Sequence, residues 1–201
     1  MAKMILASGN PHKLREFREI LEPLGCEVIS QRDAGIDIDP EETGTTFEEN
    51  SAIKARAIYE IAKCAVIADD SGLEVDALGG EPGVYSARYG GTRDDIAHND
   101  LVIAKLDGVP DEKRDARFVC AITYIDDNGV ESQFLGKFEG RIGYEMRGEH
   151  GFGYDPIFMV GDRSSAEMTP DEKNAVSHRG KALRLLAEHI RNTNNSEDKN
   201  A

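Results

Sequence analysis

The first thirty residues carry the pattern that most restricts the fold of this chain. An apolar run over residues 3–7 ends in Ser-Gly-Asn-Pro, which is typical of a strand that enters a tight turn. Leucine and phenylalanine then recur at helical spacing as far as Gly25, and a second apolar run covers residues 26–30. This strand–helix–strand order predicts an α/β fold with some parallel sheet.

Later segments predict further helices and one antiparallel hairpin. Thr45 and Thr46 each precede a Glu by three residues, which predicts a capped helix over about 46–63. Asp-Asp-Asn-Gly at 126–129 predicts a hairpin turn between two strands. Thr169 followed by Pro and a Glu three residues later is a strong helix start.

These elements together predict the architecture. We expect an elongated mixed β-sheet flanked by helices, arranged as two lobes with a central substrate cleft. The two lobes form a single domain over residues 1–191, and a disordered polar tail covers residues 192–201.

The net charge limits the possible partners. With 24 basic and 38 acidic residues the formal charge is −14, so nucleic acid backbones and anionic membranes, both polyanions, are unfavourable partners. No run approaches the ~18 apolar residues of a membrane span, and the N-terminus lacks the apolar core of a signal peptide. Cys26, Cys64 and Cys120 are far apart and lie in apolar runs, which is typical of reduced thiols in a cytoplasmic protein.

An acidic pair is the first candidate for chemistry. Asp69 and Asp70 follow a short apolar strand and precede Ser71-Gly72, and ligands of open α/β sheets gather at strand C-termini. Two adjacent carboxylates repel each other unless a metal lies between them or they point to opposite sides, as neighbours in a strand do. The alternative is a turn with solvent-facing acids.

Two cationic features could hold an anion. The turn Ser8-Gly9-Asn10 precedes a helix that carries Lys13, and helix N-termini bind anions, although this turn is not a P-loop. Lys54 falls on the apolar arc of its helix, where a lysine is costly unless it meets an acid or an anion. The alternatives are an ordinary capped turn for the first and a lysine that reaches solvent for the second.

Two further segments could hold a planar ligand. Gly151-Phe152-Gly153-Tyr154-Asp155 places an aromatic ring between glycines, which permits close approach to a base. Lys173 and the pair His178-Arg179 suit an anion or a purine carbonyl. Core-covering aromatics and ordinary surface charge are the alternatives.

Taken together, seven motifs resemble one known family, the inosine/xanthosine triphosphate pyrophosphatases of the HAM type. The match runs in order from residue 5 to about 187. The motifs that carry it are Ser8-Gly-Asn-x-x-Lys13, Glu41-Glu-Thr-Gly-x-Thr-Phe-x-Glu-Asn50, Lys54-Ala, Ala68-Asp-Asp-Ser-Gly72, Pro82-Gly-Val-Tyr-Ser-Ala-Arg88, Gly151-Phe-Gly-Tyr-Asp-Pro156 and Ser177-His-Arg-Gly180.

The resemblance implies Mg²⁺-dependent hydrolysis of ITP, dITP and XTP to a monophosphate and pyrophosphate by a homodimer. It implies that Asp70 is the general base, that Lys54 is the second catalytic residue, and that Mg²⁺ is held by Asp70 and Glu41, with Asp69 as a further candidate ligand. The substrate-binding residues that it implies are Ser8, Gly9, Asn10, Lys13, Ser71, Phe152, Gly153, Tyr154, Asp155, Lys173, His178 and Arg179.

Two rival functions share parts of this inventory. A related pyrophosphatase for methylated or pyrimidine nucleotides would use the same metal and lysines, so a substrate panel separates it. A nucleotide sensor without turnover would not need a base beside metal ligands, so release of pyrophosphate separates that one.

Overall fold

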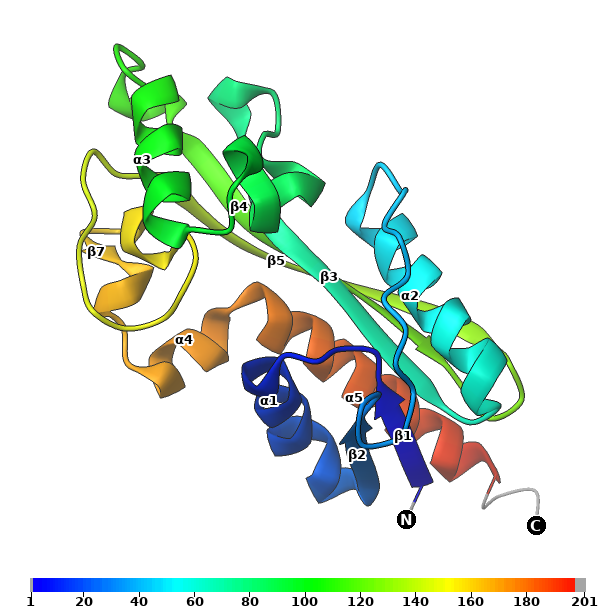
Figure 1. Ribbon diagram of the computed structural model, residues 1–201. Helices are drawn as coiled ribbons and strands as arrows, with labels where there is room; N and C mark the ends of the chain where they lie inside the picture. Colours follow the sequence, from blue (N-terminus) through cyan, green and yellow to red (C-terminus); the bar gives the residue numbers. More distant parts are fainter. Residues whose placement is uncertain (1, 198–201) are drawn as a thin grey trace. The chain divides into compact units, whose positions relative to one another are not determined.

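The structure is a computed structural model in which residues 2–197 are described, and its framework is a seven-stranded mixed sheet (Figure 1). The strand order is β2-β1-β3-β4-β5-β6-β7, with β1 parallel to β2 and β3, and β6 antiparallel to β5 and β7. The predicted mixed sheet flanked by helices is therefore confirmed. The strands are β1 (Ala2–Leu6), β2 (Cys26–Ser30), β3 (Val66–Val75), β4 (Asp115–Ile125), β5 (Glu131–Ile142), β6 (Phe158–Val160) and β7 (Arg163–Ser164).

The helices follow the predicted start and stop signals closely. Thr46 caps α2 by accepting a hydrogen bond from the Glu49 amide, and Thr169 forms the expected capping box on α4. The turn at 126–129 joins β4 to β5 as predicted. The α-helices are α1 (Pro11–Leu21), α2 (Phe47–Ala62), α3 (Asp95–Lys105), α4 (Pro170–Val176) and α5 (His178–Glu197), and a 3-10 segment over Gly83–Gly91 is interrupted by a kink at residues 88–90.

The chain divides into two compact units, each built from separate stretches of sequence. Unit 1 comprises residues 1–70, 121–135 and 180–201, and unit 2 comprises residues 71–120 and 136–179. Strands β3, β4 and β5 each begin in one unit and end in the other, so the hairpin belongs to both. The single two-lobed domain with a substrate cleft stays a prediction.

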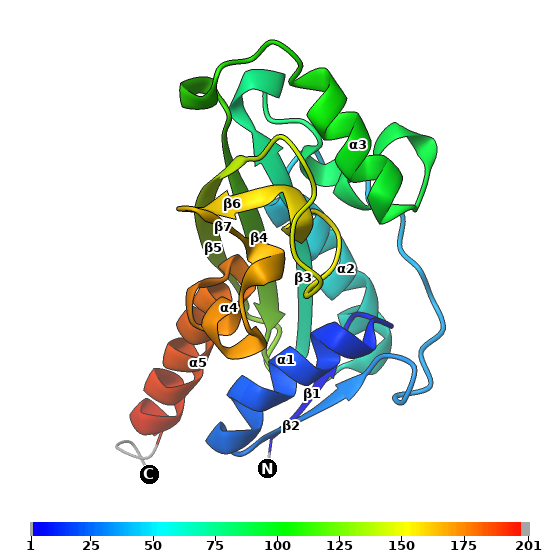
Figure 2. The same cartoon turned by 90° about the vertical axis from the view of Figure 1, so that its left-hand side faces the viewer.

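Unit 1 is built on β1, β2 and the adjoining part of β3. Helices α1 and α5 cover one face of these strands and α2 covers the other (Figures 1 and 2). Because side chains alternate along a strand, Val66 and Ala68 of β3 pack on Ala55 and Ile58 of α2. Ile67, between them, is also fully buried and lies on the opposite face of the strand.

Unit 2 has its own core, to which β3 contributes Leu73 and Val75. Phe118 and Phe158, from β4 and β6, pack with ring centroids 4.4 Å apart. A buried arginine, Arg114, lies just before β4, and its contacts are discussed below.

Two local differences from the sequence analysis concern where elements end. β3 continues to Val75 instead of ending before the acidic pair, because protein partners satisfy its polar residues. α5 extends through residues 192–197 of the expected tail, whereas residues 198–201 lie outside the described residues. No helix within residues 2–197 has the length and apolar character needed to cross a membrane.

Candidate active site

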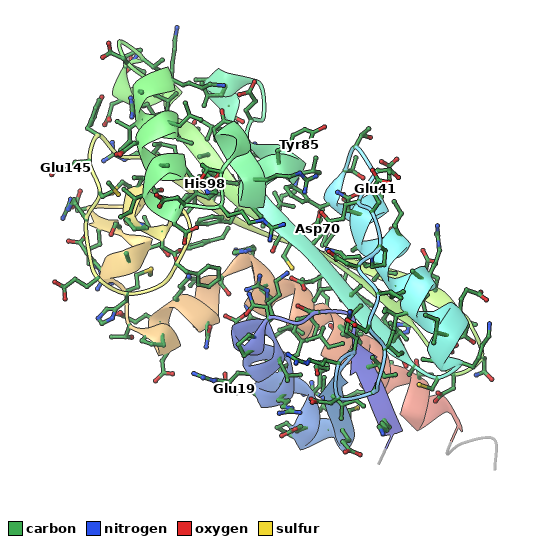
Figure 3. The ribbon with its side chains drawn as sticks, in the orientation of Figure 1. Glu19, Glu41, Asp70, Tyr85, His98 and Glu145 are labelled. Carbon is green, nitrogen blue, oxygen red and sulfur yellow. The ribbon has the colours of Figure 1, made fainter. Side chains whose placement is uncertain are left out.

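The acidic pair lies in the middle of β3, and its two carboxylates meet different helices. Asp69 and Asp70 are both buried. Asp70 shares a face with Val66 and Ala68 and therefore points to α2, as Figure 3 shows, while Asp69 pairs with Lys13 of α1. The alternation expected from the sequence thus gives each carboxylate a separate set of partners.

Asp70 is held by two side chains of α2. Its Oδ1 atom lies 3.3 Å from the Lys54 ammonium, and its Oδ2 atom accepts a hydrogen bond from the Asn50 amide at 3.2 Å. Burial raises the pKa of Asp70 above its ordinary value, and Glu42 raises it further, against the opposing pull of Lys54. A carboxylate with a raised pKa and fixed partners has the properties of a general base.

Lys54 also binds an acidic side chain on the segment before α2. Its Nζ atom lies 2.9 Å from Glu42 Oε1. Burial by itself would lower the pKa of Lys54, but Asp70, Asp69 and Glu42 outweigh it and hold this pKa above its usual value. These carboxylates therefore offset the free-energy cost of burying a lysine on the apolar arc. The sequence had left two interpretations of Lys54 open, and this is the one in which the lysine meets an acid.

The segment before α2 places Glu42, and not Glu41, beside Lys54. Glu41 is exposed on this segment (Figure 3). Its assignment as a metal ligand therefore stays a prediction. Glu42 was not singled out from the sequence because two consecutive acids in a loop carry no signal for which one turns inward.

Asn50, like Glu42, belongs to this site but is not among the site residues named from the sequence. It is fully buried, its Oδ1 atom accepts a hydrogen bond from the Gly44 amide at 2.8 Å, and its amide nitrogen donates to Asp70. A Cβ atom at Gly44 would lie 2.7 Å from Asn50 Oδ1, so only glycine permits this approach. The position of Asn50 on the apolar arc of its helix was the available signal.

Lys13 reaches across from the start of α1 to Asp69. Its Nζ atom lies 2.9 Å from both carboxylate oxygens, and Asp69 is almost fully buried. The preceding turn is internally bonded, since the Asn10 amide donates to Ser8 Oγ at 3.1 Å. Gly9 and Asn10 are exposed, so the turn reaches solvent beside a fixed lysine.

The acids of unit 1 fit a hard divalent cation only in part. Carboxylate oxygens are the donors that such ions prefer. In the part of the chain that the structure describes, no group of three His, Cys, Asp or Glu side chains is placed to hold a metal. Mg²⁺ is commonly bound by one or two carboxylates together with substrate phosphates, and Asp70 with one neighbouring acid fits that arrangement.

The charge balance at Asp70 makes a direct prediction. In the metal-free protein, Lys54→Met raises the pKa of Asp70 further, because Lys54 is the largest charge that lowers it. Titration of the Asp70 carboxyl carbon by NMR measures the shift, with Lys113→Met, an exposed lysine of unit 2, as control. A pKa that is unchanged or falls would contradict this assignment of charges.

In unit 2, the Gly151–Asp155 loop closes around its own carboxylate. Asp155 is 2% exposed and accepts hydrogen bonds from the Phe152 amide at 2.9 Å and from Lys173 Nζ at 2.5 Å. The Lys173 ammonium also lies 5.0 Å from the centre of the Phe152 ring. The ring of Phe152 is nevertheless 51% exposed, so the loop presents an aromatic face to solvent.

The His178-Arg179 pair lies at the start of α5 and is buried. The Arg179 guanidinium donates to Ser71 Oγ at 3.1 Å, and the His178 ring stacks on Phe118 with centroids 5.1 Å apart. Tyr154 donates its hydroxyl to the Ser86 carbonyl at 2.8 Å. These residues are therefore fixed parts of unit 2 and not solvated surface charges.

The site residues named from the sequence thus form two groups, one in each unit. In unit 1 the structure brings together Lys13, Lys54, Asp69 and Asp70. In unit 2 it joins Ser71 to Arg179, and Phe152 and Asp155 to Lys173. Asp70 and Ser71 are consecutive in β3, so the two groups are linked through the chain at this point.

Comparison with known proteins gives one consistent result. The model of the Ham1 family matches residues 4–189. The dITP/XTP pyrophosphatase of Bacillus subtilis (strain 168) is 50% identical over 191 residues, which cover 93% of this chain and 96% of that protein. That of Clostridium perfringens (strain 13 / Type A) is 48% identical over 200 residues, covering 95% and 98%. The solved structure of the Staphylococcus aureus Ham1 protein, 40% identical, superposes with a TM-score of 0.89 over 95% of this chain and 99% of its own.

Proposed function

The chain belongs to the Ham1 family, and on this premise we propose that it hydrolyses non-canonical purine nucleoside triphosphates to the monophosphate and pyrophosphate. ITP, dITP and XTP are the proposed substrates, and their removal from the nucleotide pool is the proposed role. The observation that carries the proposal is the buried carboxylate of Asp70, held by Lys54 and Asn50 and raised in pKa.

Asp70 is the proposed general base. Its carboxylate takes a proton from the attacking water, and its raised pKa makes it a better acceptor than an ordinary aspartate. Asn50 and Lys54 fix its two oxygen atoms, so one lone-pair direction stays defined for the water. Asp70 and Glu41, with Asp69 as a further candidate, would hold Mg²⁺, which would supply neutralisation of phosphate charge.

The triphosphate is assigned to the cations and the first turn. Lys54 and Lys13 supply positive charge to phosphate oxygens, and the turn of Ser8, Gly9 and Asn10 at the start of α1 supplies polar groups. The carboxylates that now pair with the two lysines hold them in position before substrate arrives. Lys173 is the third proposed phosphate ligand, and its ammonium pairs with Asp155 in the present structure.

The nucleoside is assigned to unit 2. The exposed ring of Phe152 offers a stacking face for the base. Gly153, Tyr154 and Asp155 shape the loop around that ring, while Ser71, His178 and Arg179 supply polar groups. A site that bonds the 6-oxo group leaves a partner unsatisfied opposite a 6-amino group, so adenine nucleotides are rejected.

A homodimer in the cytoplasm completes the proposal. The homodimer follows from the family resemblance, and the cytoplasmic location follows from the reduced-thiol pattern of the sequence. Cys26 and Cys120 are buried and Cys64 is half-buried, and none of these three residues forms a disulfide.

A substrate panel tests the proposed function. We expect pyrophosphate release from dITP and XTP with kcat/KM at least about a hundredfold above that for dATP, because a site built for one polar group rejects the analogue lacking it. dGTP and dTTP serve as further comparisons, assayed with and without Mg²⁺. Equal kcat/KM for dATP and dITP would overturn the specificity, and preference for dTTP would favour the rival pyrimidine pyrophosphatase.

A further inference from the structure

The loop that carries Phe152 is tied to a helix that none of the motif residues belongs to. Gly153 adopts a left-handed backbone, with φ of 62°, and lies at the centre of the loop. In both ribbon views the segment around it passes beside α3 (Figures 1 and 2). The contacts between them fix the backbone on the C-terminal side of the exposed ring.

α3 holds both polar groups of Gly153. The Gly153 amide donates to Asp95 Oδ2 at 2.8 Å, and the Gly153 carbonyl accepts from Asn99 Nδ2 at 2.9 Å. Asp95 and Asn99 are four residues apart and therefore lie on one face of the helix. Two opposite bonds to a single residue fix both its position and the direction of its peptide groups.

The next loop residue is held by the same helix face. The Tyr154 ring lies against the ring of His98, with centroids 5.9 Å apart and planes at 22° (Figure 3 labels His98). His98 is buried and its Nε2 atom lies 3.1 Å from the Thr92 carbonyl oxygen. α3 is itself anchored, because Asp94 caps its start and Val102 and Leu106 enter the core of unit 2.

Two features distinguish this contact from ordinary packing. The Asp95 side chain is 56% exposed, so its bond to Gly153 adds little to fold stability. Asn99 is almost fully buried, and its Oδ1 atom has no hydrogen-bond partner among the described residues. A buried, unsatisfied acceptor is costly, so packing alone would favour an apolar residue at position 99. The role that explains an asparagine here is the bond that its amide nitrogen donates to Gly153.

We propose that Asp95 and Asn99 are positioning residues that hold Gly153 and so set the Phe152 ring for stacking on the purine base. The inference rests on the proposed function, because the base is that of the non-canonical purine nucleotide. Neither residue touches the substrate in this account. Their loss therefore weakens base recognition and leaves proton transfer at Asp70 intact.

The absence of tryptophan from the sequence permits a direct reading of the loop. Phe152→Trp introduces a single tryptophan, which is excited selectively beside the six tyrosines, and its anisotropy decay and acrylamide quenching report the motion of this side chain without any ligand. The two hydrogen bonds from Asp95 and Asn99 to Gly153, here called the clamp, are then broken one at a time by Asp95→Ala or Asn99→Asp. Asn99→Asp replaces the donor by an acceptor at constant shape. Asn99→Ser provides a smaller alternative if the carboxylate prevents folding. Asp100→Ala, which removes an exposed carboxylate from the same helix, is the matched control.

Activity is measured separately with Phe152 retained. We expect Asp95→Ala and Asn99→Asp to raise KM for dITP about tenfold with kcat within about threefold, and to lower the dITP-to-dATP ratio of kcat/KM. In the tryptophan proteins we expect lower residual anisotropy and stronger quenching, with Asp100→Ala unchanged in every measurement.

The outcomes separate the two proposals. Unchanged anisotropy, KM and selectivity in the folded variants would overturn the clamp while the pyrophosphatase stands. Equal losses of kcat and kcat/KM would also overturn it, since they indicate damage beyond base recognition. If the parent protein does not hydrolyse dITP or XTP, the proposed function is refuted. The clamp is then refuted as well, whatever the anisotropy shows, because its proposed role is to position Phe152 for the purine base of that substrate.

Discussion

Asp70→Asn lowers kcat for dITP about 10³-fold, within the range reported for loss of a positioned general base. The amide has the same shape and cannot accept the proton of the attacking water. The substitution also removes one carboxylate from the proposed metal ligands. Lys54 keeps its ion pair with Glu42 at 2.9 Å, so the surrounding contacts persist.

The fold survives this substitution. Burial raises the pKa of Asp70, so the folded state disfavours the ionised form, and stability falls as pH rises from the unfolded-state pKa to the folded-state pKa. A neutral amide removes that cost, and we expect a melting temperature no lower than that of the parent at pH 7. Asp39→Asn, an exposed carboxylate of the same unit, is the control for loss of charge. Full activity in Asp70→Asn would show that another group is the base.

Arg114→Met lowers the free energy of unfolding by about 4 kcal/mol, because several buried carbonyl groups lose their donor together. Arg114 is 1% exposed, and its guanidinium donates to the carbonyls of Leu106, Ile142 and Gly143 at 2.7–2.9 Å. Its positive charge also lies at the C-terminal end of α3, where cations are stabilising. Methionine fills the space and satisfies none of these groups.

Urea unfolding of Arg114→Met beside Arg117→Met measures this effect. Arg117 lies three residues away and pairs with Asp76 and Glu139 at the surface. Surface ion pairs contribute little, so Arg117→Met changes stability by about 1 kcal/mol or less. Equal losses from the two variants would mean that the buried carbonyls do not depend on Arg114.

Residues with a strong local signal could be assigned from the sequence. Thr46 and Thr169 follow capping rules that depend on a few neighbouring residues, and both start helices as predicted. Lys54 stood out because a charge on an apolar arc demands a partner, and the structure supplies Asp70 and Glu42. Local chemistry alone was sufficient for these assignments.

Residues whose role depends on distant partners could not be assigned in this way. Asp-Asp-Ser-Gly resembles a turn, yet β3 continues through it, because Lys13, Asn50 and Arg179 satisfy its side chains from three other elements. Asp95 and Asn99 look like ordinary helix residues until Gly153, more than fifty positions later, is placed beside them. Only the tertiary structure contains that information.

The identity of the reaction products tests the central claim most directly. Phosphorus NMR of dITP incubated with the protein and Mg²⁺ distinguishes pyrophosphate from inorganic phosphate. We predict dIMP and pyrophosphate in equal amounts, formed about 10³-fold more slowly by Asp70→Asn at the same protein concentration. The appearance of dIDP and inorganic phosphate, or binding of dITP without turnover, would contradict the account.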